Sequence, residues 1–287
     1  MGRSIHCSMT ANEILNAATE LARHSEAEAT PWDARILLAH AMGGASPLSL
    51  DPRRQVEPDA HARFEALWTR RLEGTPVQHL LGEWDFYGRA FTVDRRALIP
   101  RPETEILVAA AIREAPAARR VLDCGTGSGV LAITYLLERP EARAVALDAS
   151  LEALTLARAN AVRHGVLSRL DLAASDWLSA LACRPFDLAL SNPPYLAFSE
   201  GASLPKTVRE HDPAKALFAG EDALAAIRHL LNELPPLLTP GAFFLFEIGY
   251  GQSEAVEEEI RNRHRWRFQR IEQDFDGIPR VAIARRS

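Results

Sequence analysis

The chain has 287 residues, of which 47% are hydrophobic and 25% are charged. This balance is that of an ordinary globular protein and excludes a disordered or fibrous one. No run of about 18 apolar residues occurs, so we expect no membrane span. The net charge of −5 and the pI near 6.0 argue against a stable nucleic-acid complex as the main state of the protein.

Three cysteines, Cys7, Cys124 and Cys183, are too few and too scattered for a disulfide framework or a zinc site. We therefore expect a reducing compartment and no bound metal. The first residues contain no apolar stretch of the kind found in secretory signals, which favours a cytoplasmic protein. The length suits two domains, a small one and a larger one.

Residues 1–75 predict a small helical bundle. Thr10 and Glu13 have the spacing of a capping box, and apolar residues follow them at helical spacing. Thr30 followed by Pro31 starts a second helix, and a third is expected over 58–72. Residues 1–8 precede the first helix start, and the sequence leaves open whether they are native or a non-native or misannotated extension.

Residues 76–102 predict a hairpin and a linker between the two domains. Aromatic residues on both sides of Gly88 suggest a short hairpin over 83–93. Pro100 and Pro102 flank Arg101 and stiffen the backbone, so we place the boundary here. The second domain is then 103–287.

Strand and helix patterns alternate in residues 103–287. Short apolar strands separated by helices indicate a parallel sheet with helices on both faces. The last two strand patterns follow one another around Asp276 and Gly277 with no helix between them, so they pair antiparallel. A mostly parallel seven-stranded sheet with a C-terminal antiparallel hairpin is typical of Rossmann-like class I methyltransferases. The predicted strands are 120–123, 144–148, 170–173, 187–191, 242–248, 267–273 and 280–285, and the predicted helices are 129–138, 151–164, 222–234 and 252–263.

A glycine-rich turn (residues 125–129) follows the first of these strands. Glycine lets the backbone approach a ligand at the carboxyl end of a strand. A dinucleotide fingerprint needs glycine where Val130 stands, so the G-x-G-x-G pattern favours S-adenosylmethionine (SAM) over NAD. Asp148 ends the next strand and can accept hydrogen bonds from both ribose hydroxyls. An ordinary tight connection is the alternative for the turn. The predicted cofactor residues are Gly125, Thr126, Gly127, Ser128, Gly129 and Asp148.

The acceptor loop (residues 192–195) follows another buried strand. The Asn192 side-chain oxygen and the Pro193 carbonyl can each accept one hydrogen of a planar NH2 group, and Tyr195 can stack on its plane. Such a loop orients an amide or an exocyclic amine for methyl transfer, and no general base is needed first. A simple proline-stiffened turn is the alternative. The predicted catalytic and substrate-binding residues are Asn192, Pro193, Pro194 and Tyr195.

The acceptor loop resembles that of N-methyltransferases that act on adenine N6 or on glutamine N5. Several further segments resemble the HemK/PrmC family, the peptide chain release factor glutamine methyltransferases. The resemblance covers essentially the whole chain, although His79 stands where the family often has an aromatic residue, and Ala219 and Ala223 stand where it often has glycine. The segments are 76–82 (PVQHLLG), 98–105 (LIPRPETE), 216–224 (ALFAGEDAL), 246–252 (FEIGYGQ) and 277–281 (GIPRV).

The resemblance implies methyl transfer from SAM to the side-chain amide nitrogen (N5) of the glutamine in the Gly-Gly-Gln motif of bacterial class-1 release factors. S-adenosylhomocysteine would be the product, and translation termination would be modulated. The resemblance also implies that the helical domain helps to hold the release factor. Residues 196–220 predict a loop that is long for an α/β connection, and long loops are usually functional, so we expect it to contact the protein substrate; a solvated loop is the alternative. Trp177 would lie against the adenine of SAM, Asn192 would contact SAM as well, and Arg101, Glu103 and Thr104 would lie at its methionine end.

Two other functions stay open from the sequence. An adenine-N6 methyltransferase of DNA or RNA shares the acceptor loop, but it would be expected to carry a base-flipping region and a basic face. A SAM-binding protein that has lost catalysis would not need residues 192–195 intact. We expect a monomer, since no spare apolar surface pattern stands out.

Overall fold

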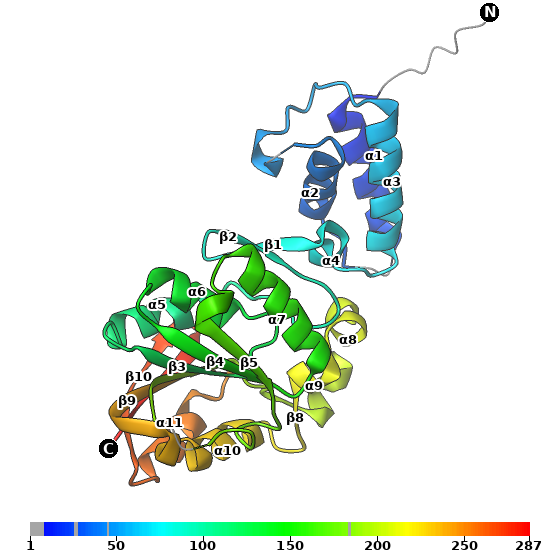
Figure 1. Cartoon of the computed structure of the whole chain (residues 1–287). Helices are drawn as coiled ribbons and strands as arrows, with labels where there is room; N and C mark the ends of the chain where they lie inside the picture. Colours follow the sequence, from blue (N-terminus) through cyan, green and yellow to red (C-terminus); the bar gives the residue numbers. More distant parts are fainter. Residues whose placement is uncertain (1–8, 26–27, 45, 183–184) are drawn as a thin grey trace, which may run out of the picture. The chain divides into compact units, whose positions relative to one another are not determined.

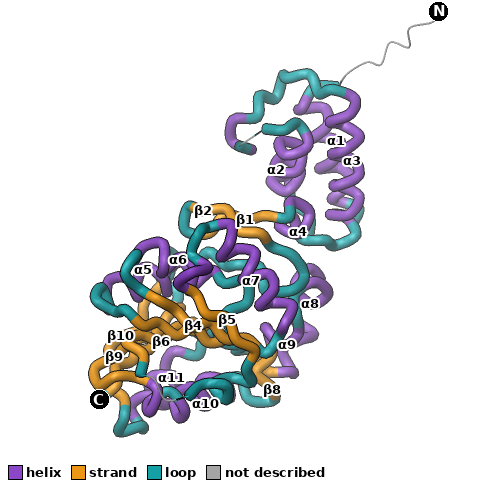
Figure 2. Tube along the Cα trace, in the orientation of Figure 1, coloured by secondary structure: helices purple, strands orange, loops and turns teal. Residues whose placement is uncertain are grey.

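The computed structural model describes residues 9–25, 28–44, 46–182 and 185–287. The hypothesis on residues 1–8 and the interpretation of Cys7 and Cys183 lie outside these residues. The chain divides into two compact units, Met1–Glu83 with Leu204–His211, and Trp84–Ser203 with Asp212–Ser287. Figures 1 and 2 show the elements of each unit. Within the described ranges, no helix is long and apolar enough to cross a membrane.

The first unit is helical, as predicted. The expected capping box forms: Glu13 N donates to Thr10 Oγ1 and Thr10 N to the Glu13 carboxylate. Thr30 and Asp33 form a second capping box, which was not predicted. Leu37 and the stacked rings of Phe64 and Trp68 belong to a core of its own. The elements are α1 (Ala11–Arg23), α2 (Pro31–Ala41), η1 (Pro47–Ser49), α3 (Pro58–Leu72), α4 (Val77–Leu81) and, from later in the chain, α8 (Lys206–His211).

The second unit is built on a seven-stranded sheet in the order β10-β11-β9-β6-β3-β4-β5. The pairs β3–β4, β3–β6, β4–β5 and β6–β9 are parallel, and β11 is antiparallel to both β9 and β10. This is the predicted mostly parallel sheet with its C-terminal antiparallel hairpin. The strands are β3 (Arg120–Cys124), β4 (Arg143–Asp148), β5 (Leu170–Ala174), β6 (Phe186–Ser191), β9 (Leu238–Glu247), β10 (Trp266–Gln273) and β11 (Pro279–Arg286).

Helices cover both faces of this sheet. Neighbouring residues of β3 show why: Val121 belongs to the core with α5, α6 and α7, whereas Leu122 belongs to the core with α10 and α11. Successive side chains of a strand point to opposite faces, so a strand that is apolar throughout is buried on both. The helices are α5 (Thr104–Glu114), α6 (Val130–Glu138), α7 (Leu151–Arg163), α10 (Ala225–Glu233) and α11 (Ser253–Arg261).

A hairpin and three short helical pieces also belong to the described elements. The predicted hairpin forms from β1 (Glu83–Phe86) and β2 (Arg89–Thr92). Asn160 of α7 anchors it, because its Oδ1 accepts from Thr92 N at 2.8 Å and its Nδ2 donates to the Ser128 carbonyl at 2.9 Å. The remaining pieces are η2 (Leu167–Arg169), η3 (Phe198–Ser203) and η4 (Pro235–Leu237).

The structure departs from the sequence prediction in three places. Helices α4 and α5 were not predicted. The prolines exclude a helix before Pro102 but not after it, and α5 begins at Thr104. Segment 196–220 is not one long loop. It folds into β7 (Leu196–Ala197), η3, α8, α9 (Ala214–Leu217) and β8 (Phe218–Gly220). Strand β9 starts at Leu238, earlier than predicted. Pro240 and Gly241 interrupt its apolar pattern at a register shift, so the pattern indicated a strand only from residue 242.

Candidate active site

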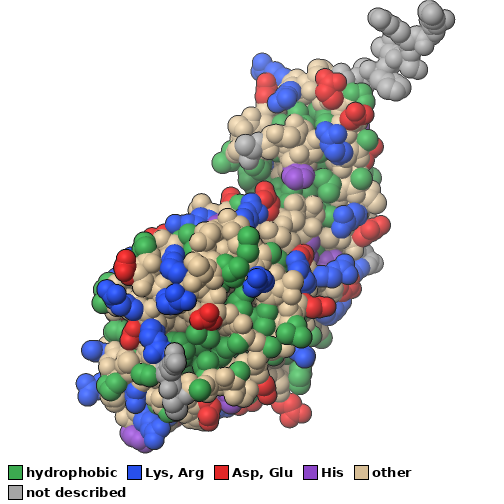
Figure 3. Space-filling view, viewed as in Figure 1, with side chains coloured by type: hydrophobic (Ala, Val, Ile, Leu, Met, Phe, Trp, Pro, Cys, Tyr) green, Lys and Arg blue, Asp and Glu red, His purple; other side chains and the backbone are tan. Residues whose placement is uncertain are grey.

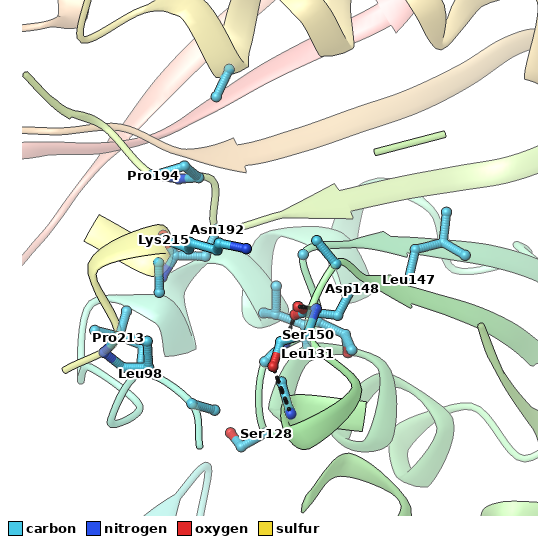
Figure 4. A pocket seen from close by; sticks show the side chains of 18 of the residues that line it. Leu98, Ser128, Leu131, Leu147, Asp148, Ser150, Asn192, Pro194, Pro213 and Lys215 are labelled. Carbon is cyan, nitrogen blue, oxygen red and sulfur yellow. Dashed lines mark hydrogen bonds between the residues drawn. The ribbon is translucent and has the colours of Figure 1, made fainter. Parts of the chain in front are cut away.

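A cavity of about 690 Å³ lies at the carboxyl ends of β3, β4 and β6 in the second unit. These strands are neighbours, with β3 between the other two, so the loops that follow them meet at one edge of the sheet. Ligands of open parallel sheets bind at such an edge, and the volume suits a small molecule. Figure 4 shows Asp148 and Asn192 reaching this cavity from different strands.

Most of the predicted site residues line this cavity. Three of them, Gly129, Pro193 and Tyr195, lie outside its lining, although the structure describes all three. From the predicted methionine end, Arg101 and Thr104 line it, and Glu103 does not. The predicted residues in the lining are Gly125, Thr126, Gly127, Ser128, Asp148, Trp177, Asn192 and Pro194.

The three glycines of the turn have positive φ, at 76°, 56° and 86° for Gly125, Gly127 and Gly129. Residues that carry a side chain rarely adopt this backbone conformation, so glycine is required. A Cβ added to Gly125 would meet no described atom within 4 Å, which leaves its backbone open to a ligand. A Cβ on Gly129 would lie 2.8 Å from Ile133 Cδ1 and 3.2 Å from Ala157 Cβ, so this glycine permits close packing of α6 on α7.

Asp123 stabilises the glycine-rich turn and the start of α6 through two hydrogen bonds. Its Oδ2 accepts a hydrogen bond from Thr126 Oγ1 at 2.7 Å and one from Ala132 N at 3.2 Å. Burial raises the pKa of this carboxyl to about 7, against the lowering effect of these two hydrogen bonds. The sequence analysis did not single out Asp123, although an acid at the end of an apolar strand is a usable signal.

The Asp148 carboxylate links two backbone segments at the cavity. Its Oδ2 accepts from Gly127 N at 2.9 Å, and its Oδ1 accepts from Ser150 N at 2.8 Å. Ser150 itself caps α7 by accepting from Ala153 N at 3.2 Å, so Asp148 is not the cap. An ionised carboxylate has about four acceptor positions, so further hydrogen bonds to a ligand remain available.

Asn192 is the first residue after β6, and a chain of hydrogen bonds runs from it into the core. Its Nδ2 donates to Thr104 Oγ1 at 3.3 Å, and this hydroxyl donates to Glu247 Oε2 at 2.6 Å. Thr104 and Glu247 are both buried. No role was predicted for Glu247 from the sequence, although it ends the apolar β9 and lies in the family-resembling segment 246–252.

The rest of the acceptor loop is supported by the segment after β9. Gln252 Nε2 donates to the Tyr195 carbonyl at 2.9 Å, and Gln252 Oε1 accepts from Gly249 N at 2.8 Å. A Cβ on Gly249 would lie 3.0 Å from Tyr195 Cδ2, so glycine makes room for this ring. Burial raises the pKa of Tyr195 to about 12, which keeps its hydroxyl protonated at neutral pH.

Trp177 lines the cavity in a left-handed backbone conformation, with φ of 50°. Few residues other than glycine adopt this conformation, and those that do cluster at functional sites. Its ring contacts that of His229, with centroids 5.7 Å apart. Trp177 therefore adds an aromatic residue to a cavity that the glycine-rich turn also lines.

Segment 212–219 contributes a further part of the cavity lining. Arg101 Nη2 donates to the buried carboxylate of Asp212 at 2.8 Å, which connects this segment to the linker before α5. Pro213 and Lys215 follow, and both line the cavity. The sequence analysis did not name Lys215, which is one of only two lysines in the chain. On the face seen in Figure 3, basic and acidic side chains are interspersed over the second unit.

Fold and site together define a class I SAM-dependent methyltransferase. A solved methyltransferase from Pyrococcus furiosus superposes with a TM-score of 0.53 at 15% identity, covering 70% of this chain and 90% of that one. The hMettl16 catalytic domain in complex with MAT2A 3′UTR hairpin 1 superposes with a TM-score of 0.56 at 14% identity, covering 88% of this chain and 91% of that one. At these identities the likeness concerns the fold alone.

Sequence relatives narrow the class to one family. The family model "Methyltransferase small domain" matches residues 102–210, and "PrmC N-terminal domain" matches residues 13–82. The release factor glutamine methyltransferase of Cereibacter sphaeroides is 43% identical, over 96% of this chain and 99% of its own. That of Koribacter versatilis is 38% identical, over 97% and 99%. The chain belongs to the release factor glutamine methyltransferase family, which confirms the resemblance to HemK/PrmC.

Proposed function

We propose that this protein transfers a methyl group from SAM to the side-chain amide nitrogen of the glutamine in the Gly-Gly-Gln motif of bacterial class-1 release factors. One observation carries the proposal. Asn192 and the glycine-rich turn line the same cavity, in a chain 43% identical to a release factor glutamine methyltransferase over nearly its whole length. This placement supports the proposal, because direct transfer requires the methyl donor and the acceptor amide to meet in one cavity.

The residues of the cavity fit SAM. The open backbone at Gly125 accommodates close approach, the Asp148 carboxylate suits a pair of ribose hydroxyls, and the apolar face of Trp177 suits a purine ring. Ser128 and Thr126 complete this half of the site. When bound, SAM supplies an electrophilic methyl group on a positively charged sulfur.

The acceptor loop would hold the substrate amide. An amide nitrogen is a poor nucleophile because its lone pair is delocalised. Asn192 Oδ1 and the Pro193 carbonyl would accept the two hydrogens of the substrate NH2 group, which concentrates electron density on the nitrogen and directs it at the methyl carbon. Positioning and electrostatics then supply most of the rate.

A single assay tests this function. Labelled SAM is incubated with the enzyme and an unmodified bacterial release factor, beside a version whose motif glutamine is alanine. DNA and ribosomal RNA serve as further acceptors. We expect label on the wild-type factor alone. Label on nucleic acid instead would favour an adenine-N6 methyltransferase, and label on both release factors would place the methyl group at another residue.

We further propose that the first unit contacts the release factor. It matches the PrmC N-terminal domain and exposes three large apolar side chains, Leu21, Trp32 and Leu48. Tryptophan is enriched among the residues that contribute most to protein–protein binding, so Trp32 is the residue to test. Trp32→Ala should raise KM for the release factor and leave SAM affinity unchanged. An unchanged KM would remove Trp32 from the contact surface.

A further inference from the structure

Three side chains from distant parts of the second unit form a hydrogen-bonded row behind the acceptor loop. Glu247 ends β9, Thr104 begins α5, and Asn192 follows β6. The Thr104 hydroxyl oxygen lies 2.6 Å from Glu247 Oε2 and 3.3 Å from Asn192 Nδ2. Thr104 and Glu247 are 2% and 3% exposed, so bulk water does not compete for the bond between these two side chains.

The direction of these bonds follows from the number of protons. A threonine hydroxyl has one proton and accepts through its lone pairs. Because the Thr104 proton goes to the Glu247 carboxylate, the Asn192 atom that faces Thr104 has to be a donor, its Nδ2. The other amide atom of Asn192, Oδ1, is then directed away from Thr104 and can accept from another group. The terminal torsion of an asparagine is roughly two-fold, so it does not choose between these orientations by itself.

We propose that Thr104 and Glu247 are positioning residues that fix the orientation of the Asn192 amide, so that Oδ1 and not Nδ2 meets the NH2 group of the substrate. This inference rests on the proposed function. The ionised Glu247 carboxylate can only accept, so it turns the Thr104 hydroxyl into an acceptor for Asn192. The ionisation state of Glu247 therefore determines, through Thr104, which atom of the Asn192 amide contacts the substrate.

Protonation of Glu247 reverses the row. A neutral Glu247 can donate to Thr104, whose own proton then turns toward Asn192 and selects its oxygen. Asn192 would then direct Nδ2 at the substrate. The N–H donors of Asn192 would face those of the substrate NH2 group, and no hydrogen bond would form between them. Uptake of one proton by the Glu247 carboxylate forms an O–H bond; no other covalent bond changes, and the Thr104 hydroxyl and the Asn192 amide rotate.

The charged groups around Glu247 place this change near neutral pH. Burial raises the pKa of Glu247 to about 7, and the Thr104 hydrogen bond opposes this rise. Glu103, before α5, raises the pKa further, whereas Arg101 in the linker and Arg280 of β11 lower it. The hydroxyl of Tyr195 in the acceptor loop is neutral in this range and adds no charge.

The test compares Thr104→Val, Thr104→Ser and Glu247→Gln with wild type. Steady-state kcat on the release factor is measured from about pH 6 to about pH 9, and SAM affinity is measured separately by calorimetry. We expect wild-type kcat to fall on the acid side with a midpoint near the pKa of about 7. Thr104→Val should lower kcat at least about tenfold at high pH, because a misdirected contact group disturbs the reacting geometry. Thr104→Ser should restore it, and the loss of kcat in Thr104→Val should exceed any loss of SAM affinity.

Glu247→Gln removes the titration and keeps the shape of the side chain. Its kcat should therefore be lower at high pH and nearly independent of pH around 7. Thr134→Val is the matched control, because Thr134 is buried in α6 and its hydroxyl has no partner among the described residues. This control should keep wild-type kcat.

Several results would overturn the inference while the proposed function stands. These are a wild-type kcat in Thr104→Val, an acid-side fall that persists in Glu247→Gln, or a kcat loss matched by an equal loss of SAM affinity. A failure of Thr104→Ser to restore kcat would assign Thr104 a packing role only. An inactive wild-type enzyme that binds SAM would overturn the proposed function and the inference together.

Discussion

The carboxylate of Asp148 accepts the backbone N–H of Gly127 at 2.9 Å, so the end of β4 is bonded to the turn that follows β3. The other carboxylate oxygen of Asp148 accepts from Ser150 N at 2.8 Å. These two bonds orient a negative charge at the edge of the cavity without using all of its acceptor positions. The same side chain thus shapes the turn and remains available to a ligand.

Replacing Asp148 should weaken SAM binding far more than it slows transfer. Asp148→Asn keeps the shape but turns one acceptor into a donor, which opposes either Gly127 N or Ser150 N. Hydrogen bonds to a charged group contribute about 1.5–3 kcal/mol, so the dissociation constant should rise about 10- to 100-fold. Calorimetric titration with SAM measures it. Asp171→Asn, on an exposed position of β5, is the control, and equal affinities in both variants would contradict the assignment.

Replacing Asn192 should have the opposite effect. Asn192→Ala removes the acceptor for the substrate NH2 group, so kcat should fall about a hundredfold or more. SAM affinity should change little, because the glycine-rich turn, Asp148 and Trp177 are untouched. The measurement is the release factor assay at saturating SAM, with Asn262→Ala on the exposed end of α11 as control. Full activity of Asn192→Ala would show that the acceptor loop does not bind the amide.

Gly129→Ala should destabilise the protein strongly. Its φ is 86°, and an added Cβ would lie 2.8 Å from Ile133 Cδ1 and 3.3 Å from Ala157 Cα. The strained backbone costs about 1–2 kcal/mol and the overpacking about 1–3 kcal/mol more. Gly165→Ala is the control, because its φ is also positive, at 70°, but a Cβ there meets nothing within 4 Å. Thermal melting of both variants separates the two effects, and equal melting temperatures would exclude the packing effect.

The difference in stability between wild type and Glu247→Gln should depend on pH in a defined direction. The pKa of Glu247 is raised from 4.5 to about 7 in the folded protein, chiefly by burial. A group with a raised pKa stabilises the folded state fully below its unfolded pKa and loses this contribution as pH rises through the folded pKa. Ionised Glu247 therefore destabilises the protein above pH 7, by an amount on the order of 3 kcal/mol.

Glutamine cannot ionise, so Glu247→Gln should melt at a higher temperature than wild type at alkaline pH. The difference should shrink as pH falls below the folded pKa of about 7 toward the unfolded value of 4.5. Melting curves of both proteins across this range check the prediction. A difference that does not vary with pH would show that Glu247 does not titrate here.

The sequence predicted those parts of the site that depend on neighbouring residues. The glycine-rich turn needs glycine at 125, 127 and 129 because each has positive φ, and this requirement is local. The prolines at 193 and 194 restrict their own backbone and that of Asn192. The alternation of apolar strands and helices likewise predicted the sheet, and the order β6-β3-β4 then brought the two loops to one edge, as expected.

Local sequence patterns did not predict where a helix or strand begins when the residues at its start lack the usual signals. Helix α5 follows a proline pair, and β9 contains Pro240 and Gly241, so neither start has the usual signals. In segment 196–220, the short elements β7 and β8 pair with each other across intervening helices. Pairing at this range depends on tertiary contacts, which sequence periodicity does not report.

The network behind the site was decided by tertiary structure alone. Thr104 and Glu247 are separated by 143 residues, and Arg101 and Asp212 by 111. Periodicity, capping and turn preferences act over a few residues, so they can identify the strand that ends in Glu247 and the helix that begins at Thr104. They cannot show that these ends meet, because this depends on how α5 packs against the sheet. Only in the folded protein does one buried carboxylate come within hydrogen-bonding distance of the hydroxyl that contacts Asn192.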